Sequence, residues 1–291
     1  MTRTLRLRRS LLAFDSPKVM GIINVTPDSF YAGSRHSAAD AATTAAAMLR
    51  DGADILDIGA CSTRPGAEPV TADQEYDRLA PALEAIRREL PADTILSIDT
   101  FRADVAARCV RQFGADIIND IGGGTLDPDM KHTVAELGVP YVLMHMRGTP
   151  DTMQGLTGYA DVIADVLSDL AFKIDDFHQA GVHDIIVDPG FGFAKTVEQN
   201  YRLLADLDIF HQTGCPVLAG MSRKTMLWRP LGIEPADALE ATVAAHTIAL
   251  MNGADIIRVH DVRPAAQSVA VFNLMRQNDK GRKYKIDTFT R

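Results

Sequence analysis

The sequence has few cysteines, no long apolar run and no excess of basic residues. Its three cysteines, Cys61, Cys109 and Cys215, are far apart and form no CxxC pair, so a disulfide framework is not expected. We therefore expect the protein in a reducing compartment, the cytoplasm. The apolar run at Leu11–Phe14 is too short for a secretory signal, and none approaches the roughly 20 residues that span a membrane. Asp and Glu outnumber Lys and Arg by 38 to 30, so nucleic-acid binding is not expected.

What the 291 residues do contain is a repeat. The string Gly-Ala-Asp-Ile begins at Gly52, Gly114 and Gly253, and a looser copy begins at Gly181. Each copy follows an apparently helical stretch and opens a run of β-branched residues. Glycine is typical of a helix C-terminus, and such a run is typical of a strand buried on both faces. The repeat therefore predicts alternating helices and parallel strands.

Eight strands are expected, which favours a single-domain α/β protein, a (β/α)₈ TIM barrel with a core from about residue 19 to 277. An open doubly wound sheet is the alternative. Leu5 and Leu7 alternate with arginines, which indicates a short N-terminal strand or β-hairpin beneath the barrel, and the polar tail from Gln277 is expected to fray. The expected strands are Val19–Asn24, Asp54–Gly59, Thr94–Thr100, Asp116–Asp120, Pro140–His145, Asp184–Asp188, Pro216–Met221 and Asp255–His260, with helices at Ala39–Arg50, Ala72–Glu89 and Tyr159–Ala180.

Each predicted strand ends in polar side chains, and the active sites of barrels lie at that edge. A single Asp or Asn in this position can be only a helix N-cap, and His145 between two methionines can be a buried side chain. Capping alone does not explain all eight ends, so we expect an active site there. The polar ends are Asn24, Asp57, Asp99, Asn119-Asp120, His145, Asp188, Ser222-Arg223-Lys224, and Arg258 with His260 and Asp261.

The segments after the strands differ in length and in glycine content. Asn24–Phe30 and Ser62–Ala67 are long and are interpreted as lids that order over a substrate. Asp188–Phe193 lacks the GxGxxG spacing of a dinucleotide site. Gly122–Gly124 is not followed by the Lys-Ser/Thr of a P-loop and is interpreted as a flexible turn.

Taken together, these strings resemble the dihydropteroate synthases, from about Val19 to Gln277. The motifs, in family order, are NVTPDSF (24–30), STRPGA (62–67), SIDT (97–100), IND (118–120), MH (144–145), DPGFGF (188–193), SRK (222–224) and RVHDV (258–262). The resemblance implies a transferase of folate biosynthesis, usually a homodimer, that condenses a dihydropterin-methyl diphosphate with 4-aminobenzoate. It implies a dissociative reaction, in which diphosphate departs before the arylamine attacks.

The resemblance also implies roles for individual residues. Pterin recognition is expected from Asp99, Asn119, Met144, Asp188, Lys224 and Arg258, and catalysis from Asp57, Asp99, Lys224 and Arg258. Diphosphate binding is expected from Asn24, Arg64, Arg258 and His260, with Mg²⁺ on Asn24. The aminobenzoate pocket is expected from Phe30, Thr63, Arg64, Pro65, Phe193 and Ser222.

The sequence departs from the family pattern near the expected lids. Ala60-Cys61 stands where Gly-Glu is usual, Tyr31–Ser34 replaces Ser-Asp-Gly-Gly, and Gly122–Gly124 replaces an Arg-Ser type string. These changes leave open a non-catalytic paralogue that binds pterin. A folate-binding methyltransferase barrel is a second alternative, but it would lack the STRPGA, SRK and RVHDV motifs. Diphosphate release from the two substrates distinguishes the three.

Overall fold

A computed structural model describes residues 3–25, 38–61 and 70–278. The strands are β1 (Thr4–Arg6), β2 (Leu11–Ala13), β3 (Lys18–Asn24), β4 (Ile55–Gly59), β5 (Ile95–Asp99), β6 (Ile117–Asp120), β7 (Tyr141–Met144), β8 (Ile185–Asp188), β9 (Leu218–Ala219) and β10 (Ile256–Val259). The α-helices are α1 (Ala38–Arg50), α2 (Ala72–Glu89), α3 (Ala103–Phe113), α4 (Met130–Leu137), α5 (Val162–Gln179), α6 (Val197–Ala205), α7 (Thr225–Leu231), α8 (Leu239–Met251) and α9 (Val262–Asn278). Short 3₁₀ turns cover Met153–Gly155, Leu207–Thr213 and Pro235–Asp237.

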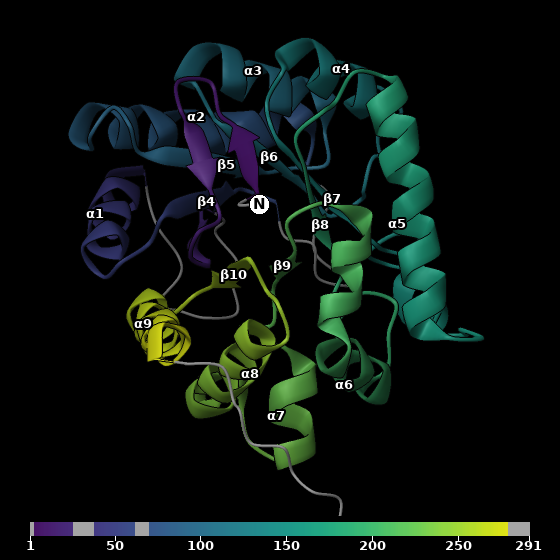
Figure 1. Ribbon diagram of the computed structural model, residues 1–291. Coiled ribbons are helices and arrows are strands. Elements are labelled where there is room, and N and C mark those ends of the chain that lie inside the picture. Colours follow the sequence, from purple (N-terminus) through teal and green to yellow (C-terminus); the bar gives the residue numbers. More distant parts are fainter. Residues whose placement is uncertain (1–2, 26–37, 62–69, 279–291) are drawn as a thin grey trace, which may run out of the picture.

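The strands from β3 to β10 form one parallel sheet that closes on itself. Its order is β8-β7-β6-β5-β4-β3-β10-β9, and the two end strands meet through an isolated parallel bridge between Val187 and Val217. Helices α1 to α9 surround this sheet (Figure 1). The predicted (β/α)₈ barrel is therefore confirmed, and the open doubly wound alternative is wrong. None of the helices in the described ranges is long and apolar enough to cross a membrane.

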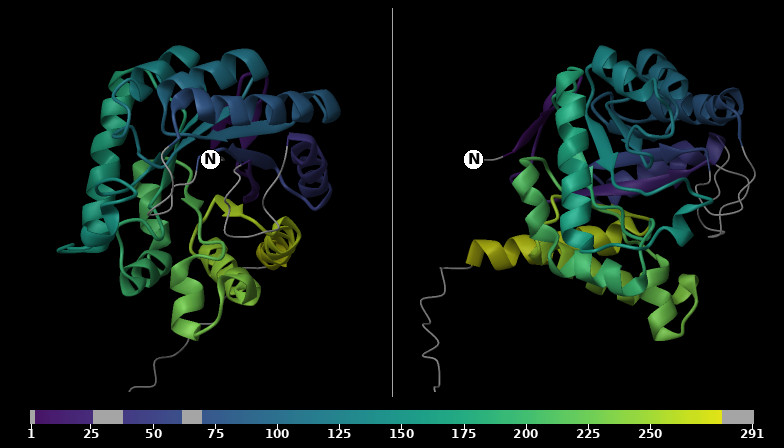
Figure 2. Two further views of the ribbon diagram at one scale, coloured as in Figure 1. Left: turned by 180° about the vertical axis from the view of Figure 1, so that it is seen from behind. Right: turned by 90° about the vertical axis from the view of Figure 1, so that its right-hand side faces the viewer.

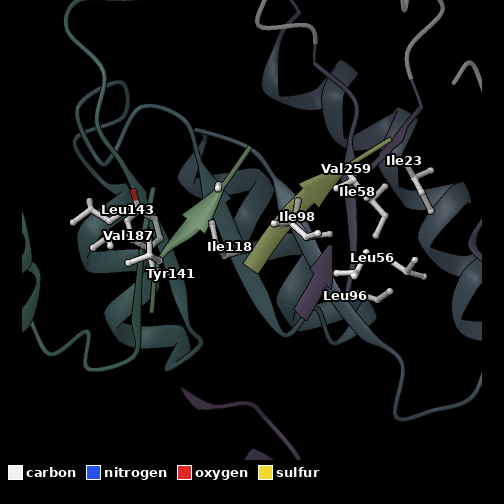
Figure 3. Close-up of a cluster of buried hydrophobic side chains, with 14 of the residues drawn as sticks. Ile23, Leu56, Ile58, Leu96, Ile98, Ile118, Tyr141, Leu143, Val187 and Val259 are labelled. Carbon is white, nitrogen blue, oxygen red and sulfur yellow. The ribbon is translucent and has the colours of Figure 1, made fainter. Parts of the chain in front are cut away.

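The barrel core has two parts because strand side chains alternate between its inside and its outside. Outward-facing residues such as Ile58, Ile98 and Ile118 are fully buried under the helices (Figure 3). The inward-facing residues of the lower half are apolar and include Met20, Ile55, Ile117, Val142, Ile186, Leu218 and Ile256. Two residues further along β4, β6, β8 and β10, the inward positions are Asp57, Asn119, Asp188 and Arg258. The pleat thus brings the polar strand ends to the inside of the upper end.

The N-terminal segment closes the lower end of the barrel, as predicted. β1 pairs antiparallel with β2, and the hairpin carries Leu5, Leu7 and Leu12. These three leucines are buried in the same cluster as Met20 and Ile186. Figure 2 shows the hairpin at one end of the barrel, in the side view.

The predicted strands and helices lie within one residue of the observed bounds at each end, except for two. The strand expected at Pro216–Met221 is only Leu218–Ala219, because Val217 and its neighbours bond irregularly to β8 and Asp255. The helix expected from Tyr159 begins at Val162, because Asp161 caps it by accepting the N–H groups of Ile163 and Ala164 at 2.9 and 3.1 Å. The tail expected to fray is helical through Asn278, and its remainder lies outside the described residues.

The prediction of a flexible turn at Gly122–Gly124 is wrong, because the turn is tightly packed. The Asp120 carboxylate accepts the N–H groups of Gly122 and Gly124 at 2.6 and 2.9 Å and the Tyr141 hydroxyl at 2.6 Å. A Cβ on Gly123, where φ is +54°, would lie 2.3 Å from the Met144 carbonyl oxygen. Asp120 is fully buried and therefore holds this turn.

Candidate active site

The upper end of the barrel carries a buried network centred on Arg258 of β10. Its Nε donates to Asp57 Oδ2 of β4 at 2.6 Å, and its Nη2 donates to Asp99 Oδ2 of β5 at 2.6 Å. The Asn119 amide of β6 donates to the same Asp57 oxygen at 2.9 Å. Asp57 is fully buried, and its Oδ1 has no hydrogen-bond partner in the described part of the chain. A buried carboxylate oxygen without a donor is costly, so a ligand or an ordered water is expected to supply one.

The charges in this network perturb each other. Burial raises the pKa of Asp99 to about 7, although Arg258 opposes the shift. Burial alone would lower the pKa of Arg258, but the charges of Asp57 and Asp99 raise it above its ordinary value. Arg258 therefore stays charged, and Asp99 changes its charge near neutral pH. Perturbed groups of this kind cluster at functional sites.

A second group of residues lies around Asp188, at the end of β8. Its Oδ1 accepts the Gly190 N–H at 2.7 Å, and burial raises its pKa, which the nearby Lys224 counteracts. The Lys224 ammonium donates to the Phe191 carbonyl and lies 4.6 Å from the centre of the Phe193 ring. Burial lowers the pKa of Lys224 to about 8. The site thus presents a carboxylate, a cation and an aromatic face together.

The two groups meet at Gly220, which follows β9. A Cβ built on Gly220 would lie 3.9 Å from Asp188 Oδ2 and 3.9 Å from the Arg258 Cβ. Gly220 therefore lies between the Asp188 carboxylate and the Arg258 side chain, and a Cβ there would be in ordinary contact with both. Close approach of a flat ligand to the backbone is one use of such a residue.

Ser222 and His260 join the segments after β9 and β10. The Ser222 Oγ accepts the His260 N–H at 3.2 Å and lies 3.0 Å from His260 Nδ1. Between Ser222 and Lys224, Arg223 has a φ of +53° and forms two bonds to Asp261, at 2.8 and 3.1 Å. A non-glycine residue with this φ is strained, and the ion pair helps to hold it. The Arg223–Asp261 ion pair therefore helps to hold the segments that carry Ser222, Lys224 and His260.

Comparisons with known proteins agree with this geometry. The family model described as pterin binding enzyme matches residues 20–260. A dihydropteroate synthase from Synechocystis is 45% identical over 253 residues, which cover 86% of each chain. This chain belongs to the dihydropteroate synthases, within the pterin binding enzyme family.

Solved structures of this family have the same fold. The Yersinia pestis dihydropteroate synthase, crystallised in a sulfonamide drug complex, has a TM-score of 0.90 and 40% identity and covers 94% of this chain and 100% of its own. The Thermus thermophilus enzyme in complex with 4-aminobenzoate has a TM-score of 0.84 and 38% identity, covering 94% and 100%. A mitochondrial folate synthesis bifunctional protein of Arabidopsis thaliana is 43% identical, and the match covers 90% of this chain but 50% of that longer protein.

The structure brings seven of the predicted site residues into two groups. Asp57, Asp99, Asn119 and Arg258 form the first group, and Asp188, Lys224 and Phe193 form the second. Met144 is buried in a small apolar cluster against which Phe193 packs. Asn24 is half-buried at the end of β3. Phe30, Thr63, Arg64 and Pro65 lie outside the described residues.

The departures from the family pattern are only partly visible. Cys61 follows β4 and lies half-buried near Arg102, and the Ala60 carbonyl accepts a hydrogen bond from Arg78 at 3.2 Å. The glycine run after β6 is the packed turn described above. Tyr31–Ser34 lies outside the described residues.

One buried group in this site is missed by the sequence analysis. Lys195, seven residues after Asp188, lies 5% exposed, and its Nζ is 3.0 Å from His145 Nδ1. His145 is itself buried, and this burial, with the nearby charge of Lys195, lowers its pKa to about 2. The sequence does not indicate this contact, because His145 is 50 residues away in the chain. The glycines before Lys195 are the one local signal, since they allow the backbone to approach closely.

Proposed function

We infer that the upper end of this barrel catalyses the dihydropteroate synthase reaction, which makes the chain a transferase of folate biosynthesis. A dihydropterin-methyl diphosphate and 4-aminobenzoate are condensed to dihydropteroate, and diphosphate is released. The observation that carries this is the set of acceptors Asp57, Asp99 and Asp188, with Asn119 beside them; Asp57, Asp188 and Asn119 are buried, and Asp99 is half-buried. The donor edge of a pterin requires such acceptors, and carboxylates make the stronger, charge-assisted bonds.

The residues also fit a dissociative course of reaction. The bond between the pterin methylene carbon and the diphosphate oxygen breaks first, and the diphosphate keeps the electron pair. The carboxylates of Asp57 and Asp99 then stabilise the resulting cation, in a partly buried site where charges interact more strongly than in water. The arylamine nitrogen forms the new bond and afterwards loses its proton to solvent or to a nearby base.

The departing diphosphate requires positive charge and hydrogen-bond donors. Lys224, Arg258 and His260 are the described residues we assign to it, and Arg64 is expected to join them. Arg258 serves two purposes in this proposal, because it already pairs with Asp57 and Asp99. An acidic protein needs such local cations to hold an anion.

We propose that Mg²⁺ accompanies the diphosphate. The described residues contain no group of three His, Cys, Asp or Glu side chains that could hold a metal by themselves. The half-buried Asn24 amide at the end of β3 offers one oxygen ligand, which fits an ion that keeps waters and binds mainly to phosphate oxygens. When bound, the ion neutralises charge on the leaving group.

We also propose a homodimer that forms through α8 and α9. These two helices pack side by side (Figure 1). Helix α8 is apolar on nearly all sides, which is typical of a helix covered on both faces. The exposed apolar face comprises Ile248 and Met251 of α8 and Val271, Leu274 and Met275 of α9, each 44% to 65% exposed. Exposed apolar side chains that gather on two neighbouring helices favour an interaction site.

A cytoplasmic location is proposed on the state of the cysteines. None of the three forms a disulfide within the described residues, and Cys109 and Cys215 are buried. Cysteines that form no disulfide are typical of proteins in reducing compartments.

Two measurements on the purified protein test the reaction. Diphosphate release is followed with both substrates and with each alone, and pterin binding is followed by calorimetry. Diphosphate that appears with equimolar dihydropteroate, and only with both substrates, supports the proposal. Pterin binding without diphosphate release would instead favour the non-catalytic paralogue, and the absence of pterin binding would overturn the assignment of the site.

A further inference from the structure

The Lys195 side chain is buried near Asp188, but it forms no ion pair with a carboxylate in the described part of the chain. It lies just before α6 and is 5% exposed. No described Asp or Glu forms an ion pair with it within 4.0 Å. Burial lowers its pKa to about 7. Burying an ammonium in this way costs several kcal/mol, so fold stability alone gives little reason for a lysine at this position.

The surroundings of Lys195 match the three donors of an ammonium. Its Nζ donates to the Gly190 carbonyl at 3.0 Å and to the Phe193 carbonyl at 3.0 Å. The third contact is His145 Nδ1, also at 3.0 Å. Because an ammonium can only donate, Nδ1 of the neutral His145 must be the acceptor, with its proton on Nε2. The lysine therefore ties the end of β7 to the turn after β8.

That turn is the segment which carries Asp188 and Phe193. Gly190, Gly192 and Ala194 all have positive φ, at +75°, +81° and +52°. A Cβ on Gly190 would lie 2.0 Å from the His145 carbonyl oxygen, so the turn lies against the end of β7. The Gly190 N–H holds Asp188 Oδ1, and the Phe193 ring lies below the Lys224 ammonium. Both carbonyls that Lys195 binds thus belong to residues that fix the orientation of site groups.

We propose that Lys195 is a positioning residue for pterin recognition, which acts by holding the Gly190–Phe193 turn so that Asp188 Oδ2 stays directed at the ligand. This proposal rests on the proposed function, because it assumes that Asp188 binds the pterin. It assigns no chemical step to Lys195. It predicts that the lysine contributes to pterin affinity only through Asp188.

A double-mutant cycle on the full chain tests this dependence. The dissociation constant of a pterin without the diphosphate is measured by calorimetry for the wild type, Lys195→Met, Asp188→Asn and the double variant. Lys195→Met should weaken binding by about tenfold in the wild type but by less than about twofold in the Asp188→Asn background, because residues in one network are not additive. Lys131→Met, which removes a half-buried lysine bound to Asp176 between α4 and α5, serves as the control and should leave affinity unchanged.

The outcomes separate the two proposals. If the wild type does not bind the pterin, the proposed function fails. If the wild type binds and Lys195→Met has no effect, or the same effect in both backgrounds, the positioning role is overturned. Lys195→Gln, whose amide can still donate to one carbonyl, replaces Lys195→Met in the cycle if the latter does not fold.

Discussion

Replacing Asp188 with asparagine separates a ligand-binding carboxylate from a structural one. In the structure, Asp188 Oδ1 accepts the Gly190 N–H at 2.7 Å, and Oδ2 lies on the side of Gly220, where we propose that the pterin binds. Asparagine keeps an oxygen for Gly190 and places an amide nitrogen at the other position. An N–H group of the pterin that faces the Asp188 Oδ2 acceptor would then face the NH₂ donor of the asparagine. A donor left unpaired costs about 1–3 kcal/mol, which corresponds to about 5- to 150-fold in affinity.

We therefore expect Asp188→Asn to weaken pterin binding by at least about tenfold in calorimetry. The melting temperature should stay constant or rise, because the raised pKa shows that burial of this charge opposes folding near neutral pH. Asp161→Asn is the matched control: Asp161 also accepts backbone N–H groups, but at the exposed start of α5. It should change neither quantity, since both residues are good caps. A drop in stability with unchanged pterin affinity would show that Asp188 is only structural.

Three further predictions concern pH, binding order and assembly. Because burial raises the pKa of Asp99 from 3.8 to about 7, kcat should fall as pH decreases through about 7. Asp99→Asn should remove this acidic limb of the pH–rate profile. If the limb persists in the variant, Asp99 is not the group that causes it. The folded chain holds this proton more tightly than the unfolded chain, so the Asp99 contribution to the free energy of unfolding should decline as pH rises from about 4 to about 7 in denaturant titrations. In calorimetry, 4-aminobenzoate should bind only when a pterin and diphosphate are present, because its expected pocket includes the segments around Phe30 and Arg64; tight binding to the free protein would contradict this. Ile248→Glu should give a monomer in light scattering. The control Phe172→Glu, at a 75% exposed position on α5, should leave the dimer intact. A monomeric wild type would refute the proposed dimer.

Much of the site is predictable from the sequence because strand periodicity determines it. Once the β-branched runs are assigned to parallel strands, Asp57, Asn119, Asp188 and Arg258 must point to the inside of one end. In the same way, the Gly-Ala-Asp-Ile repeat predicts where helices end and strands begin, and the alternating leucines predict the N-terminal hairpin. Their roles toward ligands remain predictions.

Contacts between distant segments are not predictable in this way. The pairing of Arg258 with Asp57 joins residues 201 positions apart, and no local pattern indicates it. The three glycines at 122–124 suggest a flexible turn in the sequence. In the structure, the buried Asp120 carboxylate holds the turn because it accepts the Gly124 N–H and the Tyr141 hydroxyl. Lys195 resembles an ordinary surface lysine in the sequence, and only the close approach of the β8 turn to His145 buries it.

The closure of the barrel between β8 and β9 has a consequence for ligand binding. Elsewhere neighbouring strands share a ladder, but here a single bridge, Val187 to Val217, and the bond from the Val187 N–H to the Pro216 carbonyl join the two sides. Asp188 follows Val187 directly on one side, and Lys224 lies beyond β9 on the other. A ligand held by both side chains spans this seam and supplies a connection that the backbone lacks. Ligand binding there would then also stabilise the closed barrel, so an occupied site would resist local opening between β8 and β9.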